Sequence, residues 1–488
     1  MTQSARRLTP ESHVVDILGS TRGRDQPIML VSKALQLVHS FDESVFIDEE
    51  TIFLDPFCKA GEVLLAAALK SCLIAKQRKA PLASSLEIAT ELYGGRYFAL
   101  APDERHYLLS RRTFYGNGRS HDDAFARHIR NGNYLSDTDG RLNLKKFKEE
   151  LKNMIEFIKD TQGNKKIIAV GNPPYQESDE GFGGSATAIY NHFVEALMDT
   201  AEIAEFALVI PSRWFSAGKG TEDFRNRIIA SKEIKAIRHF KQSKEVFPTV
   251  DVLGGVCFFH FQRGHKGNTL FVDDNGSTEI KLSDLDIIPD DSKAYPLIKK
   301  IQAKWSGDYV SKYAWTRKPF GFETTYFKRN APVDGKHKDA VPCYSKGRKI
   351  SYVKRSEINK NADKIDLYKV AIPRAYAPGS KTGVRRVTLP VDQYFVIPKG
   401  TISGETYNIV AAFKTRGEAD NFLRYLQTDF ARYLLGLRKI TQDIPADRWN
   451  WVPYMNPSEE WSDGKLFDFF ELTKADKEHI KKKVKEWS

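Results

Sequence analysis

Between Val31 and Phe261 the sequence alternates between short apolar runs and longer amphipathic stretches, and this alternation restricts the fold more than any other feature. The runs have the length of strands, whereas the stretches between them repeat apolar residues at helical spacing. The runs include IFLDPF (52–57), RYFALAP (96–102), KKIIAVGNPPY (165–175) and FALVIPSRW (206–214). Strands that alternate with helices predict an α/β fold with a doubly wound, parallel sheet.

The C-terminal part of the chain differs in pattern and in charge. From about residue 300 to 450 the strand-like pieces are short and lack regular helical alternation, which predicts a mixed α+β domain. Residues 301–400 contain 21 Lys and Arg but only 8 Asp and Glu, while the formal net charge of the whole chain is +12. Because this segment holds the entire positive excess, we expect it to face a polyanion.

These patterns predict an N-terminal domain over 1–265 and a basic C-terminal domain over 300–488 that ends in a charged helix. Residues 266–299 are expected to form a connecting hairpin and linker. Within them, Asn275-Gly276 separates two alternating runs, and this dipeptide favours a type I′ turn.

Cysteine usage and hydropathy restrict the compartment. The cysteines are widely spaced and form no Cys-x-x-Cys pair, which argues against a zinc ribbon and a disulfide scaffold; they are Cys58, Cys72, Cys257 and Cys343. The N-terminus has no apolar signal segment, and no run approaches the roughly 18 apolar residues of a membrane span. We expect a cytoplasmic protein with no membrane partner and no metal site.

The tetrapeptide Asn172-Pro173-Pro174-Tyr175 directly follows the predicted strand IIAVG. In an open α/β sheet, ligands bind beyond the carboxyl ends of the strands. The prolines lack N–H groups, so carbonyl oxygens beside the Asn172 amide remain available as acceptors, and Tyr175 offers a flat ring. This set suits a planar substrate with an amino group, which would attack an electrophilic methyl group without a side-chain nucleophile.

A second turn, Asp55-Pro56-Phe57-Cys58-Lys59-Ala60-Gly61, joins a predicted strand to a predicted helix. A doubly wound fold binds a nucleotide-like cofactor at such a turn, where Gly61 allows close approach and Asp55 is available to a cationic or hydroxyl-bearing group. The combined hypothesis requires the Asn172–Tyr175 turn to be accessible and to face the Asp55–Gly61 turn.

In this order the two motifs resemble those of the N6-adenine DNA methyltransferases of bacterial restriction–modification systems, and most closely the Eco57I-type modification methylases. The resemblance covers most of residues 25–261 and includes the blocks GNPPYQ (171–176), GGSATAIYNHFVEAL (183–197), PSRWFSAGKG (211–220) and VFPTVDVLGGVCFF (246–259). It implies a Rossmann-like methyltransferase sheet followed by a target-recognition domain. It also implies S-adenosyl-L-methionine as cofactor, base flipping in double-stranded DNA, and a separately encoded restriction endonuclease as partner.

The resemblance also implies roles for single residues. Asp55, Phe57 and Gly61 would line the cofactor pocket, and Asn133 is a candidate contact to the adenine ring of the cofactor. The target amine would bind to Asn172 and Pro173 within the turn that Pro174 completes. Tyr175 would stack on the flipped base, and Phe247 would be a second aromatic against it. The basic side chains expected to bind DNA include Lys346, Arg348, Lys354, Arg355 and Arg385.

The chain departs from the general pattern of the family in three places. One is the N-terminal cofactor block, for which both Thr9-Pro10 and Gln26-Pro27 are candidates. Lys59 stands where many members have glycine. Ala99-Leu100-Ala101 occupies the place of the acidic residue that would bind the cofactor ribose, and Asp103 and Glu104 are weak substitutes for it.

Other functions share parts of this pattern. Pro342-Cys343 matches the dipeptide of cytosine-C5 methyltransferases, but it lies far from the cofactor turn, so we interpret Cys343 as a loop or core residue. Asp274 and Glu279-Ile280-Lys281 match the residue types of a nuclease site that holds Mg²⁺, an Asp followed by Glu-x-Lys. The hairpin between them is very short for such a site, so we interpret it as a charged hairpin. The main alternative is a methyltransferase acting on RNA or on a protein glutamine amide; the basic segment favours DNA.

Overall fold

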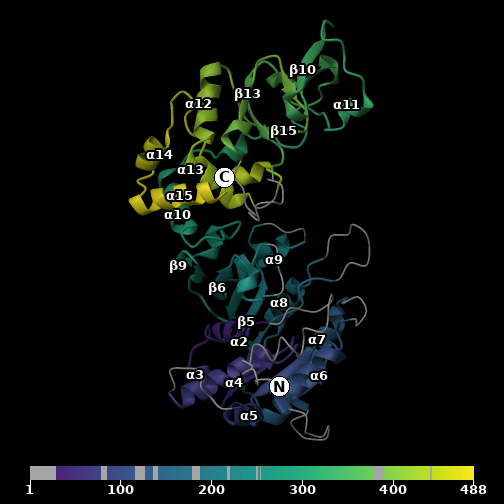
Figure 1. Ribbon diagram of the computed structural model, residues 1–488, viewed down its shortest axis with the longest axis vertical. Helices are drawn as coiled ribbons and strands as arrows, with labels where there is room; N and C mark the ends of the chain where they lie inside the picture. Colours follow the sequence, from purple (N-terminus) through teal and green to yellow (C-terminus); the bar gives the residue numbers. More distant parts are fainter. Residues whose placement is uncertain are drawn as a thin grey trace, which may run out of the picture. The chain divides into compact units, whose positions relative to one another are not determined.

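The computed structural model describes residues 29–77, 85–115, 127–135, 141–177, 187–216, 220–248, 251–252, 254–376, 389–439 and 442–487. The chain divides into two compact units, Met1–Ser292 and Lys293–Ser488. Each unit has its own sheets and helices (Figure 1). Among the described residues, no helix is both long and apolar enough to cross a membrane.

A nine-stranded sheet with the order β3-β2-β1-β4-β5-β7-β6-β8-β9 forms the centre of the first unit. Its strands are β1 (Thr51–Asp55), β2 (Tyr97–Ala101), β3 (Ile129–Asn131), β4 (Lys166–Gly171), β5 (Ile203–Pro211), β6 (Ile234–Phe240), β7 (Val256–Gln262), β8 (Thr269–Asp273) and β9 (Gly276–Ile280). Strands β1 to β5 pair in parallel, whereas β7 is antiparallel to both β5 and β6. The predicted α/β, doubly wound architecture is confirmed.

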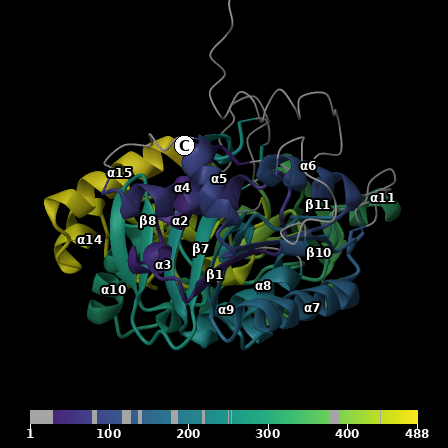
Figure 2. The same cartoon turned by 90° about the horizontal axis from the view of Figure 1, so that it is seen from below.

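Helices cover both faces of this sheet, with α2, α4 and α5 on one face and α7, α8 and α9 on the other (Figure 2). Helices of the first unit are α2 (Val31–Val38), α3 (Ser44–Ile47), α4 (Glu62–Ala75), α5 (Ser85–Tyr93), α6 (Glu104–Tyr115), α7 (Leu144–Gln162), α8 (Tyr190–Asp199) and α9 (Glu222–Ser231). The start of α7 shows how the sequence sets these elements. The Asn143 side chain caps the helix by accepting the Lys146 N–H, and apolar residues at helical spacing from Phe147 to Ile158 are buried.

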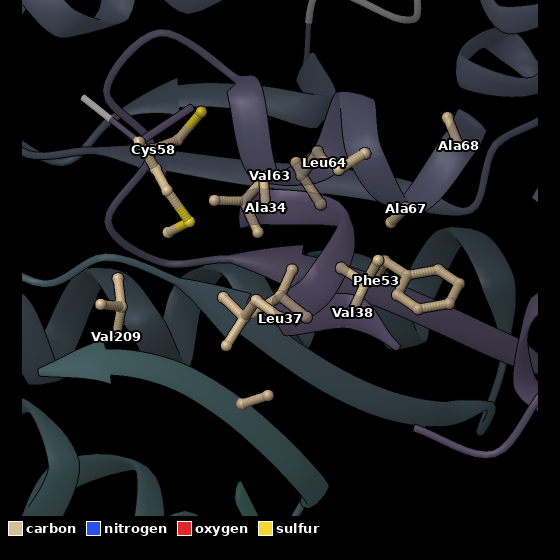
Figure 3. Close-up of a cluster of buried hydrophobic side chains, with 14 of the residues drawn as sticks. Ala34, Leu37, Val38, Phe53, Cys58, Val63, Leu64, Ala67, Ala68 and Val209 are labelled. Atoms are coloured by element: carbon tan, nitrogen blue, oxygen red, sulfur yellow. The ribbon is translucent and has the colours of Figure 1, made fainter. Parts of the chain in front are cut away.

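Helix α4 is apolar on nearly all sides because it packs against the helices α2, α3 and α5 and against β1 and β4 of the sheet. Side chains from α2, α4, β1 and β5 point toward one another in this core (Figure 3). Alanines such as Ala67 and Ala68 let the helices approach closely, while each buried leucine such as Leu64 stabilises the fold by roughly 2 kcal/mol. This core holds the start of α4, and with it the Asp55–Gly61 turn, in a fixed position.

The strand order reverses between β1 and β4. From β1 the chain moves outward to β2 and β3, and it then returns to place β4 on the other side of β1. The two strands are parallel, with Leu54 opposite Ala169, so their carboxyl ends lie side by side. Doubly wound sheets bind ligands at such a reversal. The fold therefore brings Asp55 and Asn172 to the same ligand-binding position.

The hairpin expected in 266–299 extends the sheet of the first unit, because β8 pairs in parallel with β6 and antiparallel with β9. Its turn differs from the expected one. Asp273 pairs with Gly276, so the two turn residues are Asp274 and Asn275, and neither has a positive φ. The Asp273 carboxylate stabilises this turn by accepting the Asn275 N–H at 2.8 Å, and Gly276, with a φ of 130°, follows it.

The second unit has a mixed α+β architecture, as predicted. Its two three-stranded sheets, with orders β11-β10-β14 and β13-β12-β15, enclose an apolar cluster that includes Val341, Val353 and Ile409. The strands are β10 (Ala340–Tyr344), β11 (Ile350–Lys354), β12 (Tyr368–Pro373), β13 (Phe395–Ile397), β14 (Ile402–Ser403) and β15 (Tyr407–Phe413). The helices are α10 (Ala294–Lys304), α11 (Tyr326–Arg329), α12 (Arg416–Leu426), α13 (Asp429–Arg438), α14 (Asp463–Phe469) and α15 (Lys474–Trp487).

Candidate active site

The ends of β1 and β4 are in direct contact, because Gly171, the last residue of β4, lies against Asp55, the last residue of β1. A Cβ atom added to Gly171 would lie 2.6 Å from Oδ1 of Asp55 and 3.1 Å from a ring carbon of Phe57. Only glycine allows so close an approach at this position. The two motifs, which are far apart in the sequence, therefore meet at the carboxyl edge of the sheet.

Asp55 is a buried carboxyl group, with 2% of its surface exposed. Its Oδ1 accepts the N–H of Phe57 at 2.9 Å, which closes the turn. Burial raises the pKa of Asp55 well above its ordinary value; the Phe57 hydrogen bond and Lys59 oppose this shift, and Glu62 adds to it. Burial thus shifts the Asp55 carboxyl group toward its protonated form, and a nearby cation opposes this shift.

Glu62, the first residue of α4, is a second buried carboxylate in the same turn. One of its oxygens accepts the Ala60 N–H at 3.3 Å, and the other lies 3.5 Å from the N–H of Met29. Together with Asp55 it gives the turn two buried carboxyl groups. This donor set fits a ligand that carries positive charge.

Lys59 is buried between these carboxyl groups and the Tyr175 ring. Burial lowers its pKa to about 8, although Glu62, Asp55 and Asp103 raise it. Its Nζ lies 5.9 Å from the centre of the Tyr175 ring. Lys59 thus links the cofactor turn to the Asn172–Tyr175 turn, and sequence reasoning noted it only as a departure from the family pattern.

Gly61 and Phe57 serve the packing of the turn. Gly61 has a φ of +84°, and a Cβ there would lie 2.8 Å from a ring carbon of Phe114, so the turn needs glycine for both conformation and space. Phe57 is buried in an aromatic cluster, with ring centres 5.6 Å from Phe147 and 5.0 Å from Phe193. Its ring supports the turn from the core side.

The loop after β3 is anchored to the cofactor turn by Tyr134, which sequence reasoning missed. The fully buried Tyr134 donates its hydroxyl hydrogen to the carbonyl oxygen of Pro56 at 2.7 Å. The neighbouring Asn133 is exposed at the carboxyl edge of the sheet, with a φ of 44° and its N–H bonded to the Asn131 side chain. The position of Tyr134 next to the candidate contact Asn133 is the sequence signal that could have identified this anchor.

Asp103, the weak substitute for a ribose-binding acid, contacts His106. Asp103 accepts the backbone N–H of His106 at 2.9 Å and lies 2.6 Å from its ring Nδ1. Burial raises the pKa of Asp103, but the bonds to His106 outweigh it, so the net pKa is lowered. Asp103 thus fixes the first turn of α6.

The Asn172–Tyr175 turn lies where the hypothesis requires it, but it is not accessible. Asn172 is 2% exposed and both prolines are buried, so the expectation of an open turn is wrong for this structure. The cause is close packing, since Gly171 lies against Asp55 and the Tyr175 ring packs onto the core.

Tyr175 is half-buried, and its hydroxyl donates to the carbonyl oxygen of Val209 at 3.3 Å. Its ring meets that of Phe247 edge to face, with the centres 6.2 Å apart. Phe247 is fully buried, so in this structure it supports the Tyr175 ring and offers no face of its own.

In the second unit, the basic residues expected to bind DNA lie on and beside the hairpin of β10 and β11. Lys346 and Arg348 lie at its tip, Lys354 ends β11 and Arg355 follows; all four are exposed. Arg385 lies outside the described residues. The four side chains therefore share one protruding element.

The hairpin arginines are engaged within the unit. The Arg348 guanidinium lies 4.4 Å from the centre of the Phe395 ring and donates to the Asp392 carbonyl oxygen at 2.6 Å. Arg355 pairs with Asp366 at 4.0 Å. In the described part of the chain, the Lys346 side chain forms no hydrogen bond or ion pair, so it is the more available cation.

The structure also bears on a competing interpretation. Cys343 is buried in β10, and burial raises the pKa of its thiol to about 12. It packs in the apolar cluster of the second unit. A buried, protonated thiol does not act as a nucleophile, which agrees with its interpretation as a core residue.

Residues 96–247 match the model of a protein family described as the Eco57I restriction-modification methylase. This range includes the Asn172–Tyr175 turn and Phe247. The resemblance inferred from the motifs is therefore confirmed: the chain is similar to the Eco57I restriction-modification methylases over this segment, which is less than half of its length.

A curated relative and two solved structures are also similar to the chain. An "uncharacterized adenine-specific methylase" from Mycoplasma pneumoniae is 37% identical over 123 residues, which are 24% of this chain and 29% of the relative. The type IIG restriction endonuclease BpuSI is 11% identical, with a TM-score of 0.41 over 98% of this chain and 63% of that one. The type IIL restriction-modification enzyme MmeI, solved in complex with DNA, is 10% identical, with a TM-score of 0.42 over 98% of this chain and 76% of MmeI. The match thus spans less than a third of the curated relative.

Proposed function

We propose that the protein is a site-specific DNA methyltransferase that moves a methyl group from S-adenosylmethionine to the N6 amine of adenine in duplex DNA. The observation that carries this proposal is the contact between the Asp55 turn and the Asn172 turn at the strand reversal. The match of residues 96–247 to a methylase family and the name of the curated relative support it.

The cofactor would bind at the Asp55–Gly61 turn. S-adenosylmethionine supplies an electrophilic methyl group on a positively charged sulfur and carries an ammonium group as well. The buried carboxyl groups of Asp55 and Glu62 fit these cationic groups. Phe57 and Gly61 shape the turn, and Asn133, at the same edge of the sheet, contacts the far end of the cofactor.

The target base would bind at the Asn172–Tyr175 turn. The side-chain oxygen of Asn172 and the carbonyl oxygen of Pro173 accept the two amine hydrogens, which concentrates the lone pair on nitrogen. Pro174 fixes the direction of the chain, and Tyr175 stacks on the base with Phe247 behind it. Stacking contributes about 1–3 kcal/mol per base, which offsets part of the few kcal/mol that flipping costs.

The basic hairpin of the second unit would bind the DNA backbone. Exposed lysines such as Lys346 neutralise phosphates and release counterions, so the affinity for DNA would fall steeply with salt. Because bacterial DNA lies in the cytoplasm, we propose that the enzyme acts there. Because the matched family is one of restriction-modification methylases, we propose a separately encoded restriction endonuclease as its partner.

The test is to identify the acceptor of the methyl group. The purified full-length chain is incubated with S-adenosylmethionine labelled in its methyl group and, in separate reactions, with genomic duplex DNA, total RNA or cell protein. Digestion and mass spectrometry then identify the labelled product. We expect N6-methyladenine in DNA. Label in RNA or on glutamine, and none in DNA, would instead support the alternative substrates.

A further inference from the structure

We propose that Lys59 is a catalytic residue that accepts the proton which the target amine loses as it is methylated. This inference rests on the proposed function and adds a general base to it.

Lys59 lies close to the ring on which the base is proposed to stack. Its side chain is buried, with 2% of its surface exposed, although it starts from the cofactor turn. Its Nζ lies 5.9 Å from the centre of the Tyr175 ring, the surface on which the base is proposed to stack. A stacked base and this nitrogen would therefore be close neighbours.

Three carboxyl groups and burial act in opposite directions on the pKa of Lys59. Asp55 from the end of β1, Glu62 from α4 and Asp103 from the loop after β2 all act on it, and the uncharged Tyr175 ring faces it from the turn after β4. Burial outweighs the three carboxyl groups and lowers the pKa of Lys59 to about 8. A cationic methyl donor bound nearby lowers it further, because like charges disfavour the ammonium form. Part of the Lys59 population is then a neutral amine, whose nitrogen can accept a proton.

The chemistry requires such a group. As the N6 nitrogen forms its bond to the methyl carbon, the S–CH₃ bond breaks and its electron pair stays on sulfur. The nitrogen becomes positively charged and acidic, and one of its two protons passes from its hydrogen bond in the Asn172–Tyr175 turn to Nζ of neutral Lys59. The products are a neutral methylated amine and a lysine ammonium, which Asp55 and Glu62 stabilise until it returns the proton to water. The Asn172 amide accepts hydrogen bonds but is too weak a base to keep this proton.

The experiment compares Lys59→Arg with the unaltered protein. Arginine keeps the positive charge and the length, but it does not become neutral at these pH values. Lys70→Arg, at a buried lysine of α4, is the matched control. Single-turnover methylation of DNA is measured from pH 6.5 to 9.5, and the affinities for cofactor and for DNA are measured separately.

For the unaltered protein and for Lys70→Arg we expect a rate that rises with pH and levels off below pH 8, because the bound cationic donor lowers the pKa of Lys59 further. For Lys59→Arg we expect cofactor and DNA affinities within about threefold of the unaltered protein, but a roughly 100-fold lower rate at pH 8 with no rise with pH. Lys59→Met, folded by circular dichroism, should show the same loss if the arginine variant does not fold.

An unchanged rate and pH profile in Lys59→Arg would overturn the inference. A loss confined to cofactor affinity would overturn it too, because Lys59 would then be a cofactor ligand. If the unaltered protein methylates no DNA, the proposed function itself fails, which is a distinguishable outcome.

Discussion

The carboxyl group of Asp55 lies so close to Gly171 that a Cβ there would come within 2.6 Å of Oδ1. Gly171→Ala should therefore push the β1 and β4 turns apart. We expect at least a tenfold loss of cofactor affinity, measured by calorimetry, and a loss of about 1–3 kcal/mol of unfolding free energy from overpacking. Gly417→Ala, in α12 with no atom within 4 Å, is the control. Unaltered cofactor binding in Gly171→Ala would show that the packing of Gly171 against Asp55 does not support the cofactor site.

Cofactor binding should release a proton from Asp55. Because burial holds the pKa of Asp55 well above its usual value, the carboxyl group is protonated over a wider pH range in the free protein. A bound cation lowers that pKa, so the affinity for S-adenosylmethionine should rise with pH until Asp55 is ionised in the free protein. Calorimetry in buffers of different ionisation enthalpy measures this release. Asp55→Asn should bind more weakly and without the release; an equal release from both proteins would assign the proton to another group.

Lys369 should make the stability of the protein depend on pH. It is fully buried, and its Nζ donates to the carbonyl oxygens of Ile365 and Pro398. Burial lowers its pKa to about 7, with Asp366 opposing the shift. Between pH 7 and about 10.4, the ordinary lysine value, the unfolded chain binds more protons at this site, so stability rises with pH.

The measurement is urea unfolding at pH 7 and pH 9. From pH 7 to pH 9, the unaltered protein should gain unfolding free energy relative to Lys369→Met, which lacks the titrating group. Lys349→Met, at an exposed position, controls for general charge effects. Equal pH slopes for Lys369→Met and the unaltered protein would mean that Lys369 is not buried as a titrating amine.

Lys346 and Arg348, at the hairpin tip, should respond differently to alanine. Lys346→Ala should weaken DNA binding and reduce the salt slope by about 1, because one phosphate contact is lost. Arg348→Ala should lower the melting temperature as well, because its guanidinium packs on Phe395 and bonds to the Asp392 carbonyl. DNA titrations at several salt concentrations and thermal melts measure both effects, with Lys474→Ala on α15 as the control. A lower melting temperature for Lys346→Ala alone would reverse these assignments.

The sequence predicted the ends of β1 and β4 because apolar runs stop at Asp55 and before Asn172, and a strand end is a local feature. The hypothesis required these two ends to be neighbours, but the strand pattern alone did not establish it, because the strand order 2-1-4 is set by packing across the whole sheet. The hairpin at Asp273–Gly276 shows the same limit on a small scale. The Asn-Gly pair marked its place, but the Asp273 carboxylate selected another turn.

Burial was the property that sequence patterns predicted least well. Asn172, Lys59 and Arg348 are polar residues in turns, a pattern typical of accessible groups. Asn172 is buried by close packing against the β1 turn and Lys59 is buried beside the Tyr175 ring, whereas Arg348 stays exposed but is held by the Phe395 ring of another strand. Each of these contacts joins segments far apart in the chain.

The central claim is that Asn172 binds the target amine beside the cofactor turn, and the most direct test is methyl transfer by Asn172→Ala. The variant and the unaltered protein are compared in labelled transfer to duplex DNA, with DNA and cofactor affinities measured in parallel. We expect N6-methyladenine from the unaltered protein, no detectable transfer from the variant, and DNA affinity that is largely retained. Transfer to adenine by Asn172→Ala at a rate near that of the unaltered protein would contradict the account.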